Sequence, residues 1–370
     1  MFIRMDKKEL LDAVTPALCA VSSKGTLPAL ECLYFSADEK EGKVTVLAFD
    51  NSKGVKTTFS ASVLAPGGIL LPGQKLVSFI RSLPDGEVSI SSDDKFLTTI
   101  SCRKSKLEIA GMSEANFPAL PELRGDKSFI VKQSVLKRQL GAVLFSVQTK
   151  DLKPSLTGVL FELKKNLLTL VSCDGYRISK TTQECENELE EKFIVPGRTL
   201  NELVRLLADD EEELKIIFTR RHIIFEFEDL IFFSRLIEEE FIDYKKSLPQ
   251  VFSCTMLFDP IEAEAGVERC ALVIDDNARS PLSITIAEDV VYLKSQTANG
   301  KVEEEFSADV QGDGLTIGFN NRYFLEALRG ALLFTEEKVF AEFVNPMSGA
   351  VIRPTEGEEF YYLLLPVRMQ

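Results

Sequence analysis

A repeat of 124 residues constrains this chain more than any other feature of its sequence. The segment Leu70–Leu76 (LLPGQKL) returns as Ile194–Leu200 (IVPGRTL), 124 residues later. A weaker third copy begins at Ile317, 123 residues after Ile194. A fixed period of this kind is typical of tandem copies of one structural unit.

Further landmarks keep the same spacing. Asp50 and Asp174, which follow similar apolar runs, are 124 residues apart, and so are Phe117 and Phe241. The chain of 370 residues also exceeds the size of one ordinary hydrophobic core. We therefore predict three modules, with the boundaries 1–125, 126–250 and 251–370.

Each predicted module contains two helices and several strands. A first helix is expected at residues 7–21, 132–147 and 259–271, and a second at residues 73–83, 198–207 and 320–333. In the middle module Leu136, Leu140 and Val143 fall at helical spacing. Apolar runs such as 157–163 and 167–173, and a hairpin of 214–218 with 223–227, predict strands. The expected fold class is α+β, with two helices packed on antiparallel sheets in every module.

The composition is that of a folded protein in water. Hydrophobic residues make up 45% of the chain and charged residues 27%. No apolar run approaches the roughly 20 residues that cross a bilayer, so no membrane partner is expected. The seven cysteines contain no CxxC pair, which indicates small buried side chains in a reducing compartment, the cytoplasm.

The charges are unevenly distributed along the chain. The formal net charge is −14, which argues against nucleic acid as a partner. However, the predicted helices 73–83 and 132–147 carry basic residues and no acids, while acids gather in the loops 184–191 and 209–213. Basic helices at equivalent places favour a surface that holds phosphates without reading sequence. Solvated helix faces remain the alternative, and the acidic helix 259–271 does not fit the pattern.

No catalytic or cofactor-binding motif is present, so neither a cofactor nor a bound metal is expected. The single histidine, His222, falls in a predicted hairpin turn. The segment Asp174-Gly175-Tyr176-Arg177 is the most chemically suggestive cluster. It is either a glycine turn with an ion-paired Asp174 and Arg177 or part of a binding site.

Short motifs in a fixed order give the chain a family likeness. They are Thr26-Leu27-Pro28, the LLPGQKL segment with Arg81-Ser82-Leu83-Pro84, Asn116-Phe117-Pro118, Leu156-Thr157-Gly158, Asp174-Gly175-Tyr176-Arg177, Asp243-Tyr244, Leu248-Pro249, Ile317-Gly318-Phe319-Asn320 with Tyr323, and Leu365-Pro366-Val367-Arg368-Met369. On these residues the whole chain resembles the sliding-clamp family, the beta subunits of bacterial DNA polymerase III.

The resemblance implies a head-to-tail homodimer that forms a ring around double-stranded DNA. A head-to-tail contact gives a closed ring when its rotation permits. In this family, basic residues of the inner helices and of the rim contact DNA without sequence specificity. Here these residues would be Lys24, Lys75, Arg81, Lys137, Arg138, Lys150 and Arg198.

The family also binds short partner peptides, which carry a glutamine and a leucine-phenylalanine pair, in a cleft between its second and third domains. The matching residues here are Leu156, Cys173, Gly175, Tyr176, Arg177, Ile178, Ile242, Lys246, Ser247, Asn320, Tyr323, Met347, Leu363, Leu365, Pro366, Val367, Arg368 and Met369. Tyr176, Ile242, Lys246 and Ala278 depart from the residues usual in the family, which leaves the peptide preference open.

The dimer contact implied by the resemblance joins an edge strand near Leu107 and Ile109 to a helix end near Leu272 and Val273. The expected function is that of a non-enzymatic processivity factor. Its expected partners are the DNA polymerase III alpha subunit, the clamp loader, other polymerases and mismatch-repair factors. Two alternatives remain: an enzyme centred on Asp174, Tyr176 and Arg177, and a clamp-like scaffold that does not encircle DNA.

Overall fold

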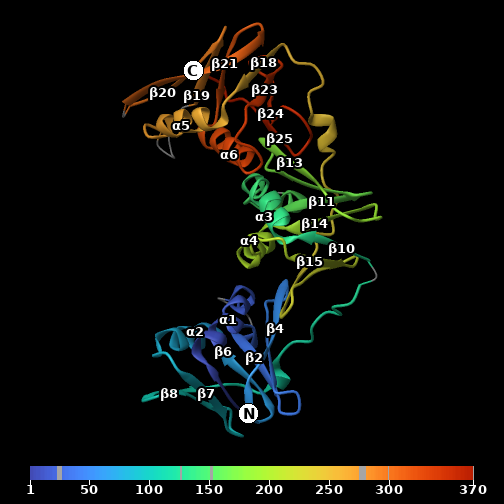
Figure 1. Ribbon diagram of the computed structural model, residues 1–370, viewed down its shortest axis with the longest axis vertical. Coiled ribbons are helices and arrows are strands. Elements are labelled where there is room, and N and C mark those ends of the chain that lie inside the picture. The colour runs from blue at the N-terminus through green and yellow to red at the C-terminus, as the bar shows by residue number, and fades with distance from the viewer. Residues whose placement is uncertain (23–26, 126, 151–152, 275–280, 299, 370) are drawn as a thin grey trace. The chain divides into compact units, whose positions relative to one another are not determined.

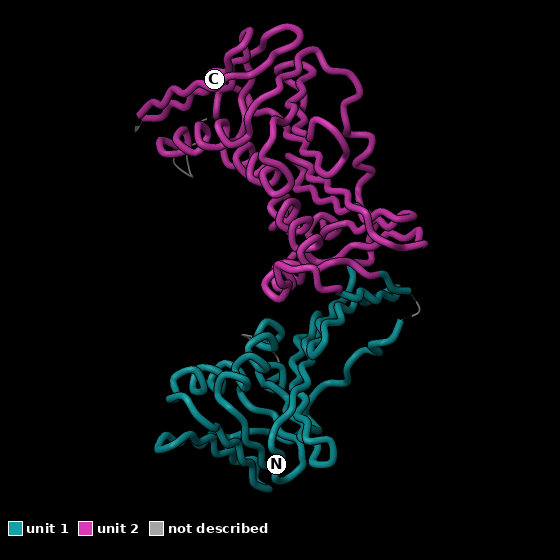
Figure 2. The backbone as a smooth tube through the Cα atoms, in the orientation of Figure 1, with its two compact units in different colours: residues 1–129, 214–236 teal, residues 130–213, 237–370 magenta. Residues whose placement is uncertain are grey.

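The computed structural model describes residues 1–370 except 23–26, 126, 151–152, 275–280, 299 and 370. The chain forms two compact units (Figure 2). Unit 1 contains residues 1–129 and 214–236, and unit 2 contains residues 130–213 and 237–370. The predicted boundaries near 125 and 250 stay a prediction.

The same order of elements occurs three times in the described part of the chain, with one additional strand, β5, in the first set (Figure 1). The first set comprises β1 (Phe2–Asp6), α1 (Lys7–Val14), β2 (Cys32–Asp38), β3 (Lys43–Phe49), β4 (Lys53–Ser60), β5 (Ser62–Ala65), β6 (Gly67–Pro72), α2 (Gly73–Ser82), β7 (Glu87–Ser92), β8 (Leu97–Cys102) and β9 (Ser105–Ala110). The second comprises β10 (Lys127–Lys132), α3 (Gln133–Gly141), β11 (Gly158–Lys164), β12 (Leu167–Cys173), β13 (Arg177–Glu184), β14 (Glu191–Pro196), α4 (Gly197–Leu206), β15 (Glu213–Phe218), β16 (His222–Glu226) and β17 (Leu230–Arg235). The third comprises β18 (Cys254–Phe258), α5 (Pro260–Ala271), β19 (Leu282–Ala287), β20 (Val290–Thr297), β21 (Gly300–Gly312), β22 (Leu315–Phe319), α6 (Asn321–Leu332), β23 (Val339–Phe343), β24 (Ala350–Pro354) and β25 (Phe360–Leu364).

The helices that follow the repeated segment agree with the sequence to within one residue. In α2 and α4 the helix begins at the glycine that follows a proline, and leucines at helical spacing are buried, for example Leu200 and Leu203. In α6 the Asn320 side chain accepts a hydrogen bond from the backbone N–H of Tyr323 at 3.3 Å, which satisfies a free donor of the first turn.

Two of the predicted first helices are shorter than expected. The first ends at Val14, because Pro16 has no backbone N–H to continue the helix, and a 3₁₀ turn, η1 (Pro16–Ala20), follows. The second ends at Gly141, after which the backbone N–H of Ser146 donates to the Val143 carbonyl three residues back, in another 3₁₀ turn, η4 (Leu144–Ser146). The third, α5, matches its prediction.

The strands form antiparallel sheets. A five-stranded sheet, β5-β1-β7-β8-β9, lies in unit 1, together with most of an eight-stranded sheet, β10-β15-β16-β17-β4-β3-β2-β6. A twelve-stranded sheet, β14-β11-β12-β13-β25-β24-β23-β18-β21-β20-β19-β22, lies in unit 2, with helices α3 to α6 on one side of it (Figure 1). The α+β class is therefore confirmed.

The cysteines are part of the hydrophobic core. Six of the seven are buried, and Cys19 is half-buried. Burial, followed by the nearby Glu31 carboxylate, raises the pKa of the Cys32 thiol to about 11. These side chains act as small hydrophobic groups, as expected.

Tyr362 provides a test of the core in unit 2. Its side chain is fully buried, and its hydroxyl has no hydrogen-bond partner among the described residues. A buried unpaired hydroxyl destabilises the folded state, so Tyr362→Phe is expected to stabilise the protein by about 1 kcal/mol. Urea denaturation followed by circular dichroism measures this change.

Tyr244→Phe is the matched control for Tyr362→Phe. The Tyr244 hydroxyl is also buried but donates a hydrogen bond to Glu162 at 2.9 Å, so its removal is expected to destabilise the protein. Equal destabilisation by the two changes would contradict the expectation for Tyr362.

Candidate peptide site and charged helices

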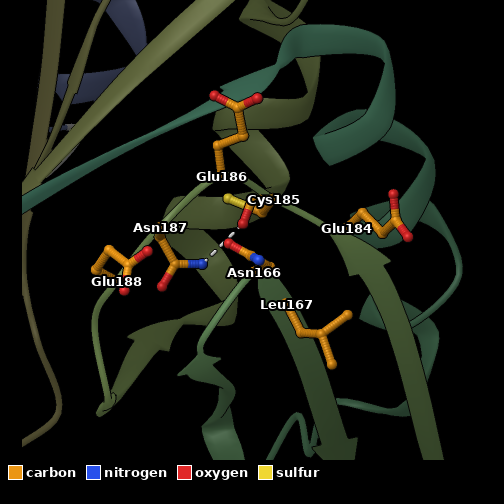
Figure 3. Close-up of a pocket in the computed structure, with 7 residues that line it drawn as sticks. All are labelled: Asn166, Leu167, Glu184, Cys185, Glu186, Asn187 and Glu188. Carbon is orange, nitrogen blue, oxygen red and sulfur yellow. Dashed lines mark hydrogen bonds between the residues drawn. The ribbon is translucent and has the colours of Figure 1, made fainter.

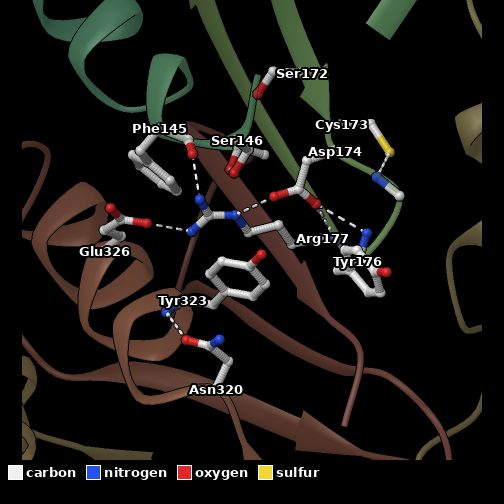
Figure 4. Close-up of polar contacts among 12 residues, drawn as sticks. Phe145, Ser146, Ser172, Cys173, Asp174, Tyr176, Arg177, Asn320, Tyr323 and Glu326 are labelled. Atoms are coloured by element: carbon white, nitrogen blue, oxygen red, sulfur yellow. Dashed lines mark hydrogen bonds and ion pairs between the residues drawn. The ribbon is translucent and has the colours of Figure 1, made fainter. Parts of the chain in front are cut away.

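The turn at residues 174–177 is built around the Asp174 side chain (Figure 4). Its Oδ1 accepts hydrogen bonds from the backbone N–H groups of Tyr176 (2.9 Å) and Arg177 (3.1 Å). Gly175 has a φ of +92°, a conformation that favours glycine. Asp174 Oδ2 lies 3.0 Å from Arg177 Nε, so the predicted ion pair is confirmed.

Arg177 is the centre of a buried polar network. Its Nη1 donates to Glu326 Oε2 at 2.5 Å, and its Nη2 donates to the Phe145 carbonyl. The guanidinium also lies 4.0 Å from the centre of the Tyr323 ring. Only 4% of Arg177 is exposed, so the residue connects β13 to α6 from beneath the surface.

Four predicted peptide-site residues form one apolar cluster. Leu156, Cys173, Ile178 and Leu363 are buried together, and Ile242 packs against them. The pairing of β13 with β25, in which Ile178 lies opposite Leu363, brings these segments together. We refer to this cluster as the floor.

The C-terminal segment lies beside the floor. The backbone N–H of Leu365 donates to the Tyr176 carbonyl (2.9 Å), and that of Val367 donates to the Gly318 carbonyl (2.8 Å). A Cβ at Gly318 would lie 2.9 Å from the Val367 carbonyl oxygen, a backbone atom, so this close approach favours glycine. The segment thus bridges the 174–177 turn and β22.

The other predicted residues are exposed or only partly buried. Large hydrophobic side chains are prominent among them, including Tyr176 (64% exposed) and Met347 (70% exposed). Lys246 pairs with Asp243 of its own turn at 2.8 Å. The exposed members are Gly175, Tyr176, Lys246, Ser247, Asn320, Met347, Leu365, Val367, Arg368 and Met369, and Tyr323 and Pro366 are half-buried. Ala278 lies outside the described residues.

Two contributors were not anticipated from the sequence. Glu326 follows Tyr323 by one helical turn, so the i, i+3 spacing places both on one face of α6, but it gives no signal for the pairing with Arg177. Phe145 takes part through its backbone carbonyl, for which a sequence contains no signal.

The 174–177 turn has a counterpart in unit 1. Asp50 Oδ1 accepts from the N–H groups of Ser52 (2.9 Å) and Lys53 (2.8 Å), and Asp50 Oδ2 lies 3.0 Å from Lys53 Nζ. The next residue is Gly54, and the Phe233 ring lies so close that a Cβ on Gly54 would be 2.2 Å from it. The corresponding residue in unit 2 is Ile178, a member of the floor.

The predicted DNA-contacting residues occur on helices in both units. Most are exposed, and Lys137 is half-buried. Lys75 and Arg81 lie on α2 in unit 1, and unit 2 carries Lys137 and Arg138 on α3, Lys150 after η4, and Arg198 on α4. Lys24 lies outside the described residues.

The acidic helix α5 has partners. Arg329 of α6 lies 2.8 Å from Glu264 and 2.5 Å from Glu268, and Arg269 pairs with Glu304 at 2.7 Å. The acids of α5 therefore neutralise a basic residue of its neighbour, which explains the exception in the charge pattern.

Other acids lie in loops. Asp210 and Glu212 accept, through their carbonyls, the first backbone N–H groups of α3. A pocket formed by residues 166–167 and 184–188 contains Glu184, Glu186 and Glu188 (Figure 3). Its negative charge makes it unsuited to phosphate.

The predicted dimer residues lie at or near unpaired strand edges. Leu107 and Ile109 are half-buried on β9, an edge strand of the five-stranded sheet. Leu272, at the end of α5, is 82% exposed. Val273 lies beside the start of β21. If Gly300 carried a Cβ, that atom would lie 3.2 Å from Val273 Cγ1.

The chain is similar to sliding clamps of known structure and to curated members of that family. A crystal structure of a putative DNA polymerase III beta subunit from Eubacterium rectale is 32% identical, with 99% of both chains covered and a TM-score of 0.94. A beta sliding clamp from Staphylococcus aureus is 28% identical over 362 residues, which is 95% of each chain. The Bacillus subtilis DNA polymerase sliding clamp is 23% identical, covers 100% of both chains and has the same fold, with a TM-score of 0.95.

The class of protein defined by this fold is therefore the sliding clamp. Family models match three consecutive segments, the N-terminal (1–121), central (130–243) and C-terminal (245–368) domains of the DNA polymerase III beta subunit. The chain belongs to the DNA polymerase III beta subunit family. No helix within the described residues is both long and apolar enough to span a membrane.

Proposed function

We propose that two copies of this chain close head to tail into a ring around duplex DNA and act there as a non-enzymatic processivity factor. The ring would tether the DNA polymerase III alpha subunit, other polymerases and mismatch-repair factors, and a clamp loader would open it. Tethering raises the local concentration of a partner at the DNA without any chemical step. The site of action would be the cytoplasm, and the chain would consist of three domains, 1–125, 126–250 and 251–370.

The observation that carries this proposal is a strand pairing that occurs twice in the chain. β4 pairs with β17, and β13 pairs with β25, both antiparallel. In each case the third strand after the first helix of one module joins the final strand of the next. By the same rule, β21 of the third module requires the final strand of a first module, β9, from a second chain.

Both strands have the free edges that this rule requires. Among the described strands, β9 pairs only with β8, and residues 300–307 of β21 pair only with β20. The charges are complementary, because Arg103, Lys104 and Lys106 are exposed at β9, and Glu303 and Glu305 are exposed on β21. Such a contact repeated twice gives a closed two-chain ring of six modules.

The proposed DNA contacts are the basic residues of the helices, Lys75, Arg81, Lys137, Arg138 and Arg198, together with Lys150 and Lys24. The proposed peptide site is the floor with its exposed surroundings. An enzyme centred on Asp174 and Arg177 is not favoured, because their polar atoms bind each other, the turn and Glu326.

The experiment that tests the ring is retention on DNA of different topology. The chain is expected to elute from gel filtration at the mass of two chains and, once loaded, to remain on nicked circular DNA. Linearising the DNA is expected to release it, because the ring slides off the ends. Equal release from circular and linear DNA would favour the scaffold that does not encircle DNA.

A further inference from the structure

A buried carboxylate beside the predicted peptide site has three partners. Glu162 lies on β11 and is 3% exposed. Its Oε2 accepts a hydrogen bond from the Tyr244 hydroxyl at 2.9 Å, and its Oε1 lies 2.7 Å from Lys192 Nζ and 3.3 Å from Lys245 Nζ. A buried charge is tolerated only when it is paired and hydrogen-bonded, so these groups hold one another in place.

Two of these partners belong to the turn that carries predicted peptide contacts. Tyr244 and Lys245 lie in η6 (Tyr244–Ser247), which also contains Lys246 and Ser247. The Tyr244 ring is buried in the floor cluster, while its hydroxyl reaches Glu162. A single side chain therefore links Glu162, the floor and the turn η6.

The first module lacks this arrangement. In β2 and β6, Cys32 lies opposite Pro72, just as Gly158 lies opposite Pro196 in β11 and β14. Four residues further along, the pair is Ser36 opposite Gly68 in the first module and Glu162 opposite Lys192 in the second. Glu162 and Lys192 thus occur together in the second module and have no counterpart in the first. The second module is also the one whose later turn, η6, reaches the floor through Tyr244.

The ionisation states strengthen the contact. Burial alone would raise the pKa of Glu162, but hydrogen bonds from Lys192 and Tyr244 and the Lys192 charge lower that pKa to about 2. Burial and the Glu162 carboxylate raise the pKa of Tyr244. At neutral pH a charged acceptor therefore faces a protonated donor, which makes a strong hydrogen bond.

We propose that Glu162 is a positioning residue for partner-peptide binding: it fixes Tyr244 and thereby holds η6, with Lys246 and Ser247, beside the floor. This inference rests on the proposed function of the peptide site. If η6 were not held in place in the free protein, peptide binding would have to order it, and the conformational entropy lost in that ordering would lower the affinity. Glu162 itself is buried and is not expected to touch the peptide.

The test uses Glu162→Gln, Tyr244→Phe and the double variant in the full chain, with a fluorescent acetyl-Gln-Leu-Ser-Leu-Phe peptide followed by anisotropy. Each single change is expected to weaken binding about tenfold, and the double variant is expected to be no weaker than the worse single one, because both act on the Tyr244–Glu162 hydrogen bond: Glu162→Gln removes the charge of its acceptor and Tyr244→Phe removes its donor. The loss is expected in the dissociation rate. Amide hydrogen exchange is expected to become faster in residues 242–248.

Glu226→Gln is the matched control, since it breaks the exposed Lys215–Glu226 pair of unit 1 and is expected to leave peptide affinity unchanged. If Glu162→Gln does not fold, Tyr244→Phe decides alone, because it keeps both lysine pairs. Wild-type peptide affinity in folded Tyr244→Phe, or unchanged exchange in residues 242–248, would overturn this inference only. A wild-type chain that binds no peptide would overturn the proposed peptide site, and this inference with it.

Discussion

Removing residues 366–370 is expected to abolish binding of a Gln-Leu-x-Leu-Phe peptide, with a loss of affinity of about a hundredfold or more. The deletion takes away Val367 and Met369, two exposed apolar side chains of the C-terminal segment, and the backbone hydrogen bond from Val367 to Gly318. Short peptides obtain most of their affinity from a few apolar anchors, so the loss of one side of the proposed site is expected to have a large effect. Fluorescence anisotropy with the labelled peptide measures the change.

The ring is expected to survive this deletion, because neither β9 nor β21 is touched. Retention on nicked circular DNA should therefore equal that of the full chain. Leu167→Ser is a suitable control: Leu167 is 39% exposed at the opposite end of β12 from Cys173. Peptide affinity that persists after the deletion would show that the site lies elsewhere.

The double change Leu107→Lys and Ile109→Lys is expected to convert the two-chain ring into single chains. Both residues are half-buried on the edge strand β9, and the proposed contact with β21 would bury them further. Placing two lysines there is expected to weaken self-association about a thousandfold, since the contact loses two apolar side chains and burying charged groups costs free energy. Analytical ultracentrifugation measures the association, and retention on circular DNA should disappear with it.

Leu64→Lys is the matched control for this change. Leu64 is 47% exposed on β5, at the opposite edge of the same five-stranded sheet. Its substitution is expected to leave a stable two-chain ring. A ring that persists with both lysines on β9 would place the contact between chains on a different surface.

The sequence predicted those parts of the fold that depend on local chemistry. The helices after the Pro-Gly segments follow from proline, glycine and a leucine face, and the ion pair of Asp174 with Arg177 follows from their spacing. The length of the first helices was wrong in two modules. There, competition between α-helical and 3₁₀ hydrogen bonds near Pro16 and Val143 decided the end of the helix.

Contacts between residues distant in the chain could not be predicted. Arg177 and Glu326 are 149 residues apart, and nothing local to either one specifies the other. The ion pairs of α5 are also contacts between distant segments. Its acids did not fit the charge pattern of the other helices in the sequence, but in the structure Glu264 and Glu268 pair with Arg329 of α6. The roles of the proposed peptide and DNA residues stay predictions.

The near-identical turns at Asp50 and Asp174 have a consequence for the valency of the assembly. The turn in unit 1 has its Asp–Lys pair, but the Phe233 ring occupies the space beside Gly54, where unit 2 has Ile178 in the floor. A two-chain ring would then offer two docking positions at these turns, one in each copy of unit 2, instead of four. Two different enzymes could be resident on one ring, and a single molecule carrying two linked peptides would compete far better than either peptide alone, provided its linker spans the two sites.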